Sequence, residues 1–113
     1  MKKKIHIIGG GLAGCELAYQ LSLYKIFTHL YEMRPKVKTD AHQTGRLSEL
    51  VCSNSFRSDD SVYNAVGLLH EELRLSNSLI MEAADKNKVP AGSALAVDRD
   101  MFSKYIDAKI KSN

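Results

Sequence analysis

The sequence has few cysteines, and they are not arranged to bind a metal. Its two cysteines, Cys15 and Cys52, lie far apart, and the chain contains neither a CxxC pair nor a Cys/His cluster. Zinc sites and disulfide frameworks both require patterned cysteines, so we expect neither. Free cysteines fit a reducing compartment, and the expected location is therefore the cytoplasm.

Long apolar runs and a strong net charge are also missing. Lys2, Lys3 and Lys4 precede the apolar run Ile5–Ile8, but this run soon ends in glycines and is too short for a signal peptide. No stretch approaches the ~20 apolar residues that span a bilayer, so no membrane contact is expected. A net charge of +3 does not by itself indicate a nucleic-acid partner. The 113 residues, 44% of them hydrophobic, suit one small globular domain.

The start of the chain has the pattern strand, glycine turn, helix, strand. The β-branched run Ile5–Ile8 predicts a buried parallel strand, a helix is expected over about residues 12–24, and a second strand over 26–31. Residues 4–32 therefore predict one βαβ unit, the beginning of a Rossmann-type α/β fold. Nothing obvious supplies the strand that normally pairs on the other side of the first one, so we expect the fold to be incomplete, with an unpaired edge.

The remainder divides into three predicted segments. Residues 33–61 show no periodicity and are expected to form a long functional loop. Residues 62–88 predict a helical segment capped by Asp60 or Ser61, with Gly67 as the point where it would kink or split. Residues 93–111 predict a strand over 94–97 followed by a helix capped by Asp98. The apolar side of the middle segment comprises Val62, Val66, Leu69, Leu73, Ile80 and Ala84.

Gly9, Gly11 and Gly14 form the pattern G-x-G-x-x-G between the predicted strand and helix. In a dinucleotide site, the first glycine allows the tight turn, the second lets a pyrophosphate approach the backbone, and the third lets the helix pack on the strand. Glu32 follows at the end of the second strand, at the spacing of a carboxylate that binds a ribose hydroxyl and repels a 2′-phosphate. NADP is therefore disfavoured, while FAD and NAD are both compatible. The predicted cofactor-binding residues are Gly9, Gly10, Gly11, Leu12, Ala13, Gly14 and Glu32.

Two further features have competing interpretations. A free cysteine is most often a small buried hydrophobe, and this is the expectation for Cys52 on chemistry alone. However, Arg46 and Arg57 are near it in sequence, and cationic neighbours activate a thiol. Cys15 is expected to serve packing, and the basic segment 34–38 is expected to be a solvated loop. His6 and His70 are expected to have structural places, in a buried strand and a helix, and not to bind a metal.

Several longer blocks resemble one family. The blocks IIGGGLAGCELA, LYEMRP, ELVCSNSFR, NAVGLLHEELR and VPAGSALAVDR occur in this order. Together they resemble the N-terminus of the folate- and FAD-dependent tRNA uracil-5-methyltransferases (TrmFO), over essentially all 113 residues. The glycine block is shared by many flavoproteins, whereas the blocks around Glu32 and Cys52 are more specific.

The resemblance implies a partial FAD-binding domain over residues 1–113. It implies FAD as cofactor, methylenetetrahydrofolate as methylene donor, NAD(P)H as reductant and the T-loop of tRNA as substrate. Cys52 corresponds to one of two catalytic cysteines in the family. A thiol in this reaction adds to C6 of uracil or acts in proton transfer, and the sequence leaves the choice open. Family members are several times longer, so a further C-terminal portion is expected.

Three alternatives remain open from the sequence. The chain is an inactive, truncated remnant of such an enzyme; or it is a nucleotide-binding module without redox chemistry; or it belongs with the other flavin-dependent tRNA-modifying proteins (GidA/MnmG). The last group shares the glycine block but lacks the LYEMRP and VCSNS blocks, and for that reason we rank it below the methyltransferase.

Overall fold

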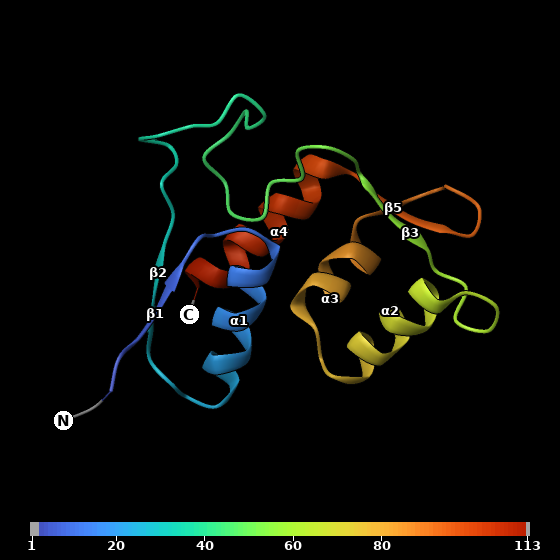
Figure 1. Ribbon diagram of the computed structural model, residues 1–113, viewed down its shortest axis with the longest axis horizontal. Helices are drawn as coiled ribbons and strands as arrows, with labels where there is room; N and C mark the ends of the chain where they lie inside the picture. Colours follow the sequence, from blue (N-terminus) through green and yellow to red (C-terminus); the bar gives the residue numbers. More distant parts are fainter. Residues whose placement is uncertain (1–2, 113) are drawn as a thin grey trace.

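The computed structural model describes residues 3–112, which form two small sheets and four helices (Figure 1). Strands β1 (Ile5–Ile8) and β2 (Thr28–Tyr31) make a parallel pair, with helix α1 (Leu12–Leu23) between them in sequence. Strands β3 (Ser55–Ser58), β4 (Lys88–Val89) and β5 (Ala94–Val97) form an antiparallel sheet in the order β3-β5-β4. The other helices are α2 (Ala65–Leu75), α3 (Leu79–Lys86) and α4 (Arg99–Lys111).

The βαβ unit predicted for residues 4–32 is present and confirms the α/β class. Parallel pairing aligns Ile5 with Thr28 and Ile8 with Tyr31, so both strands end beside the glycine turn. The second strand begins later than expected, because Lys25 has a φ of +57° and turns the chain before it becomes extended. Helix α1 ends at Leu23, one residue before the expected end.

Among residues 3–112, no helix covers one face of the β1–β2 sheet (Figure 1). Ile7 is buried on the side of α1, whereas His6 is exposed, against the expectation of a buried strand, and Ile8 is 81% exposed. His6 stacks on His29 at 5.3 Å and on Tyr31 at 5.7 Å between ring centroids. In Figure 1 the helices of the described chain all lie to one side of this sheet. Parallel sheets are normally covered by helices on both faces. A parallel pair with helices on one face only therefore corresponds to part of a Rossmann-type fold.

Residues 33–61, expected to form a long functional loop, contain a strand. Residues 55–58 form β3, which pairs with β5, and Asn54 extends the contact by accepting a 2.9 Å hydrogen bond from the amide of Val97. The sequence does not predict strand β4 either. Both strands are short and have no clear alternation of their own, so their pairing with β5 defines them.

The segment predicted as one helix over 62–88 is two helices, α2 and α3. The break is at residues 76–78, where Asn77 has a φ of +61°, and not at Gly67. Gly67 instead packs α2 against the backbone of Asp60. The cap of α2 is Asn64, whose side chain accepts from the amide of Val66, whereas Asp60 accepts from the amides of Val62 and Tyr63 in the preceding turn.

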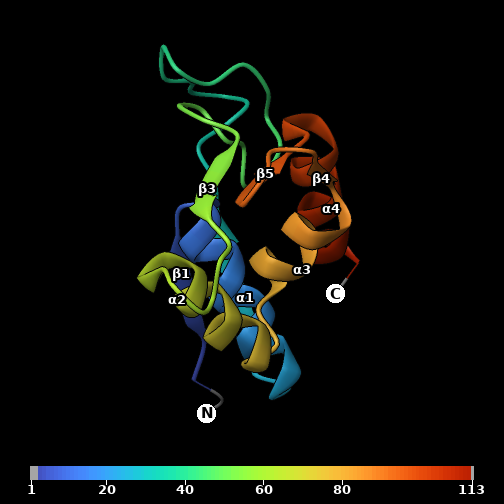
Figure 2. The same cartoon turned by 90° about the vertical axis from the view of Figure 1, so that its right-hand side faces the viewer.

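Helix α2 leaves much of its predicted apolar side in solvent. Ile80 and Ala84 of α3 are buried as expected, but Val62, Leu69 and Leu73 are exposed. The core of the molecule lies instead between α1, α3, α4 and β5, and its fully buried centre includes Leu79, Leu95, Phe102 and Ile106. The predicted strand over 94–97 and the helix capped by Asp98 are both present, and Asp98 accepts from the amide of Met101 at 3.0 Å. Figure 2 shows β5 and α4 with α3 on one side of α1.

Candidate functional site

The glycine turn connects the ends of β1 and β2 to the start of α1. Gly9 has a φ of +107°, a conformation that L side chains rarely adopt. Its amide donates a 2.8 Å hydrogen bond to the carbonyl of Tyr31, which ties the turn to the end of β2. The turn therefore sits at the carboxyl ends of both parallel strands, where ligands bind in open α/β sheets.

The other glycines of the turn differ in the space around them. A Cβ on Gly14 would lie 1.9 Å from the carbonyl oxygen of Gly9, so only glycine fits where α1 crosses the turn. A Cβ on Gly10 would lie 2.5 Å from Leu47 Cδ2, whereas one on Gly11 would meet nothing within 4 Å. The turn therefore has open space at Gly11, which is the N-cap of α1, and also at Gly9, where the positive φ rather than a neighbour requires glycine.

The N-terminus of α1 is free of side-chain anions. Gly11 gives no side-chain cap, no acidic residue lies in the first turn, and the first hydrogen bond of the helix runs from the amide of Cys15 to the carbonyl of Gly11. The amides of Leu12, Ala13 and Gly14 precede that bond and have no intrahelical acceptor. A helix start of this kind attracts phosphate through its amides and its dipole.

Glu32 points its carboxylate at the turn. Its Oε1 accepts from the amide of Gly10 at 3.1 Å, and its Oε2 accepts from the amide of Arg34 at 3.0 Å and from Arg34 Nε at 2.6 Å. Burial raises the pKa of Glu32, but the hydrogen bonds from Arg34 and Gly10 lower it by more. The pKa of Glu32 therefore lies below its ordinary value. A carboxylate has about four acceptor positions, so this ionised group keeps one for a ligand hydroxyl.

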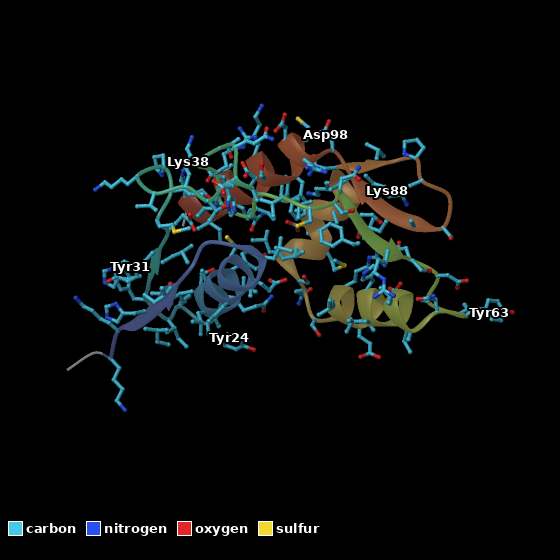
Figure 3. All side chains as sticks on the ribbon, turned by 45° about the horizontal axis from the view of Figure 1, so that its top comes forward. Tyr24, Tyr31, Lys38, Tyr63, Lys88 and Asp98 are labelled. Carbon is cyan, nitrogen blue, oxygen red and sulfur yellow. The ribbon has the colours of Figure 1, made fainter. Side chains whose placement is uncertain are left out.

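Arg34 contradicts the expectation of a solvated basic loop. Its side chain is 3% exposed, and besides Glu32 it donates from Nη1 to the carbonyl of Thr44 at 3.2 Å. The same Nη1 lies 3.7 Å from Glu49 Oε2. Glu49 in turn accepts from the amides of Gln43 and Thr44. Lys36 and Lys38 of the same segment are exposed, as expected, and Lys38 is seen at the outer side of the loop in Figure 3.

Ser48 holds this loop against the glycine turn, a contact that no pattern in the sequence indicates. Its amide donates to the carbonyl of Gly10 at 2.8 Å, and its hydroxyl donates to the carbonyl of Gly11 at 3.3 Å. Ser48 is fully buried and has a φ of +54°. Carbonyl oxygens would repel a phosphate. The two bonds from Ser48 keep the carbonyls of Gly10 and Gly11 directed toward the loop.

We expect acid to loosen the loop around Arg34. Burial raises the pKa of Glu49, but hydrogen bonds from Thr44 and Gln43 and the charge of Arg34 lower it more, so its pKa in the folded chain lies below the ordinary value of 4.5. A lowered pKa contributes stability above about pH 4.5, and this contribution is lost as the pH falls through the folded value. Urea unfolding between pH 7 and pH 3 should show a fall in the free energy of unfolding that is shallower in Glu49→Gln than in the unchanged chain.

The matched control is Glu72→Gln on the exposed side of α2, whose profile should follow that of the unchanged chain. An equally steep fall in the unchanged chain, Glu49→Gln and Glu72→Gln would contradict this expectation.

The two cysteines occupy opposite environments. Cys15 is fully buried beneath the turn, with Sγ 3.4 Å from the carbonyl of Gly10, which confirms its packing role. Burial raises the pKa of the Cys15 thiol. Cys52 is exposed, so the expectation of a small buried hydrophobe is wrong. It lies in the loop just before β3, and nearby Arg46 is engaged elsewhere, with Ser103 at 3.0 Å and Asp100 at 2.7 Å.

Within residues 3–112 no cluster of three His, Cys, Asp or Glu side chains is placed to hold a metal ion. His70 is buried in α2, with Nδ1 2.9 Å from Asp59 Oδ1. A cavity of about 680 Å³ lies at the far end of α1, lined by residues such as Tyr19, Phe27 and Lys109, and it includes no residue of the glycine turn. No helix in the described part is long and apolar enough to cross a membrane.

Comparison with known proteins gives a consistent family. The model of the family described as "Glucose inhibited division protein A" matches residues 4–113. A protein of Bartonella henselae named methylenetetrahydrofolate–tRNA-(uracil-5-)-methyltransferase TrmFO is 67% identical over 109 residues, covering 96% of this chain and 23% of the relative. Proteins of the same name from Ruegeria sp. and Mesorhizobium japonicum are 57% and 61% identical over 112 residues, covering 99% of this chain and 25% and 24% of the relatives. The chain thus spans about a quarter of the length of the curated relatives it matches.

Proposed function

Because the chain belongs to the glucose inhibited division protein A family, we propose that its glycine turn and Glu32 bind the pyrophosphate and a ribose of FAD. The observation that carries the proposal is the unfilled space at Gly11 beside an α1 N-terminus without an anion of its own. Gly9, Gly10, Gly11, Leu12, Ala13 and Gly14 supply the turn and its amides. Glu32 supplies the acceptor for a ribose hydroxyl.

The residues present fit such a group in charge and in shape. The pyrophosphate carries negative charge and meets free amides and the positive end of a helix dipole. The ribose hydroxyl meets a carboxylate whose pKa lies below its ordinary value, so the carboxylate is ionised and accepts near neutral pH. Ser48 keeps two turn carbonyls away from the phosphate side.

We further propose that the chain contributes this FAD-binding part to methylation of uracil C5 in tRNA. The relatives that carry this activity in their names are 57–67% identical over nearly the whole chain. This identity favours them over the GidA/MnmG alternative, whose name the matching family model carries. Methylenetetrahydrofolate would donate the methylene group, NAD(P)H would be the reductant, tRNA the partner and the cytoplasm the location. Reduced flavin, when bound, supplies the electrons that convert methylene to methyl.

Cys52 is the proposed catalytic residue on this chain. An exposed thiol can reach a substrate, which a buried one cannot, and its thiolate form is the nucleophile. Addition of the sulfur to C6 of uracil would make C5 nucleophilic; proton transfer is the other role open to it. Cys15 is unsuited to either role because it is fully buried under the turn.

Two measurements test the proposal. Titration of the chain with FAD, followed by flavin fluorescence, should show saturable binding that Glu32→Gln weakens by about tenfold, the loss of one charged hydrogen bond. Cys52→Ala should leave this binding unchanged. Joined to the remaining portion of the Bartonella henselae relative, the chain should methylate tRNA, and Cys52→Ala should abolish that activity.

The outcomes separate the alternatives. Saturable FAD binding without methylation in the joined protein indicates the inactive remnant. Binding of ADP but not FAD indicates a nucleotide module without redox chemistry. Loss of FAD binding in Cys52→Ala would show that Cys52 has a structural role and would overturn its assignment as catalytic.

A further inference from the structure

We propose that Arg34 is a positioning residue for Glu32: it fixes the carboxylate toward the ribose and, because it is itself held by the loop, does not pair with a 2′-phosphate. The inference rests on the proposed FAD site and deepens it, because it names the residue that holds the ribose-binding carboxylate in place. Neither the glycine pattern nor the spacing to Glu32 indicates such a role.

The contacts of Glu32 show how it is held. Arg34 donates both its amide and Nε to the same oxygen, Oε2, at 3.0 and 2.6 Å. This leaves Oε1 directed at the turn, where the amide of Gly10 donates to it at 3.1 Å. A carboxylate held from two sides loses little further freedom when a hydroxyl binds, and this preorganisation favours affinity.

Arg34 itself cannot turn toward a ligand without breaking the loop. Its Nη1 donates to the carbonyl of Thr44 at 3.2 Å and faces Glu49 at 3.7 Å, and the side chain is 3% exposed. Glu49 is anchored by the amides of Gln43 and Thr44 at 2.9 and 2.6 Å. Nε and Nη1 of the guanidinium are therefore directed at protein acceptors on two sides.

This arrangement has a consequence for the charge at the ribose. In sites that accept a 2′-phosphate, an arginine near the ribose is free to pair with it. Here one guanidinium lies between two carboxylates, Glu32 and Glu49, so the group as a whole carries net negative charge. A phosphate on the 2′-oxygen would face this charge with no free cation in the group to bind it.

The test is a double-substitution cycle on FAD affinity. We expect Arg34→Met to weaken FAD binding by about tenfold in the unchanged chain and by less than about twofold in the Glu32→Gln chain, since Arg34 acts through Glu32. The matched control is Lys36→Met, which removes the same charge from an exposed position of the same loop and should leave affinity unchanged. Equal weakening by Arg34→Met in both backgrounds would overturn the inference.

A second variant guards against misfolding. Arg34→Lys keeps the charge and most of the bulk, but one ammonium cannot reproduce the geometry of the fork toward Glu32, Thr44 and Glu49. If Arg34→Met fails to give a cooperative thermal transition, Arg34→Lys replaces it in the cycle with the same expectation. No weakening by Arg34→Lys would also count against the inference.

Selectivity for the 2′-position is the second readout. ADP-ribose should compete with FAD, and its 2′-phosphate form should compete at least about tenfold less well. This ratio should shrink in Glu32→Gln, and equal competition by both forms in the unchanged chain would overturn the selectivity claim. Absence of any FAD binding by the unchanged chain would overturn the proposed function itself, whereas normal binding with an insensitive Arg34 would overturn only this inference.

Discussion

Alanine at position 14 should destabilise the chain by roughly 3 kcal/mol, at the upper end of what overpacking a tight contact costs. The added Cβ would lie 1.9 Å from the carbonyl oxygen of Gly9 and 3.4 Å from Ile7 Cγ2. The contact with Ile7 is an ordinary one, but the Gly9 oxygen is a backbone atom, so its clash cannot be relieved by rotation of a flexible side chain. Chemical denaturation followed by circular dichroism would measure the change, and a midpoint equal to that of the unchanged chain would contradict it.

The matched control is alanine at Gly11, three residues earlier. A Cβ there meets nothing within 4 Å, and the residue has a φ of −81°, which any L residue adopts. Stability should fall by less than about 1 kcal/mol, mainly because alanine is a poorer N-cap than glycine. FAD affinity, however, should drop by at least about tenfold, because the methyl group fills the space assigned to the pyrophosphate. The pair thus separates a glycine needed for folding from one needed for binding.

Removal of the Glu16 side chain should cost about 2–4 kcal/mol, because it leaves buried donors without an acceptor. Glu16 projects from α1 to the start of α3, where its carboxylate accepts from the Ser78 hydroxyl, from the amide of Leu79 at 2.9 Å and from the amide of Ile80 at 3.3 Å. Leu79 is fully buried, so water cannot replace the lost acceptor at its amide. The free energy of unfolding of Glu16→Ala, from urea titration, measures the effect.

Gln20→Ala provides the comparison one helical turn further along α1. Gln20 donates to Glu16 at 3.2 Å and to the carbonyl of Asn77 at 3.1 Å, but the latter contact is exposed. Its loss should cost less than about 1 kcal/mol, because water can take over an exposed hydrogen bond. If the two variants were equally stable, the role of Glu16 as the acceptor for α3 would have to be abandoned.

The parts of the fold that sequence predicted well are those specified by neighbours along the chain. The glycine spacing, the β-branched run before it and the helical period after it all belong to residues 4–32, and all four elements of that unit are present. Asp98 was likewise identifiable as a cap from its position before an apolar period. In the βαβ unit and at the Asp98 cap, the residues that define each element are close in sequence and contact one another.

The parts that sequence missed depend on partners far along the chain. The end of α2 is followed by a new helix because Glu16, which lies 62 residues before Ser78 in sequence, supplies the acceptor for the start of α3. Strand β3 forms because it pairs with β5. The position of Ser48 is set by its hydrogen bonds to the carbonyls of the glycine turn. Arg34 was placed in solvent because a run of basic residues usually is solvated, and only the fold of the loop brings Thr44 and Glu49 around it.

The starts of α1 and α3 differ in the source of the negative charge that each receives. Helix α3 takes a carboxylate from within the molecule, Glu16, so its polarity is balanced whatever the solution contains. At helix α1 the carboxylate of Glu32 reaches only the amide of Gly10 before the N-cap, and no side chain caps the helix or places an acid in its first turn, so the amides of that turn are left to solutes. Inorganic phosphate or sulfate in a buffer would therefore compete with FAD for the start of α1 and would not affect the start of α3. Which anion binds at α1 thus depends on the buffer as well as on the chain.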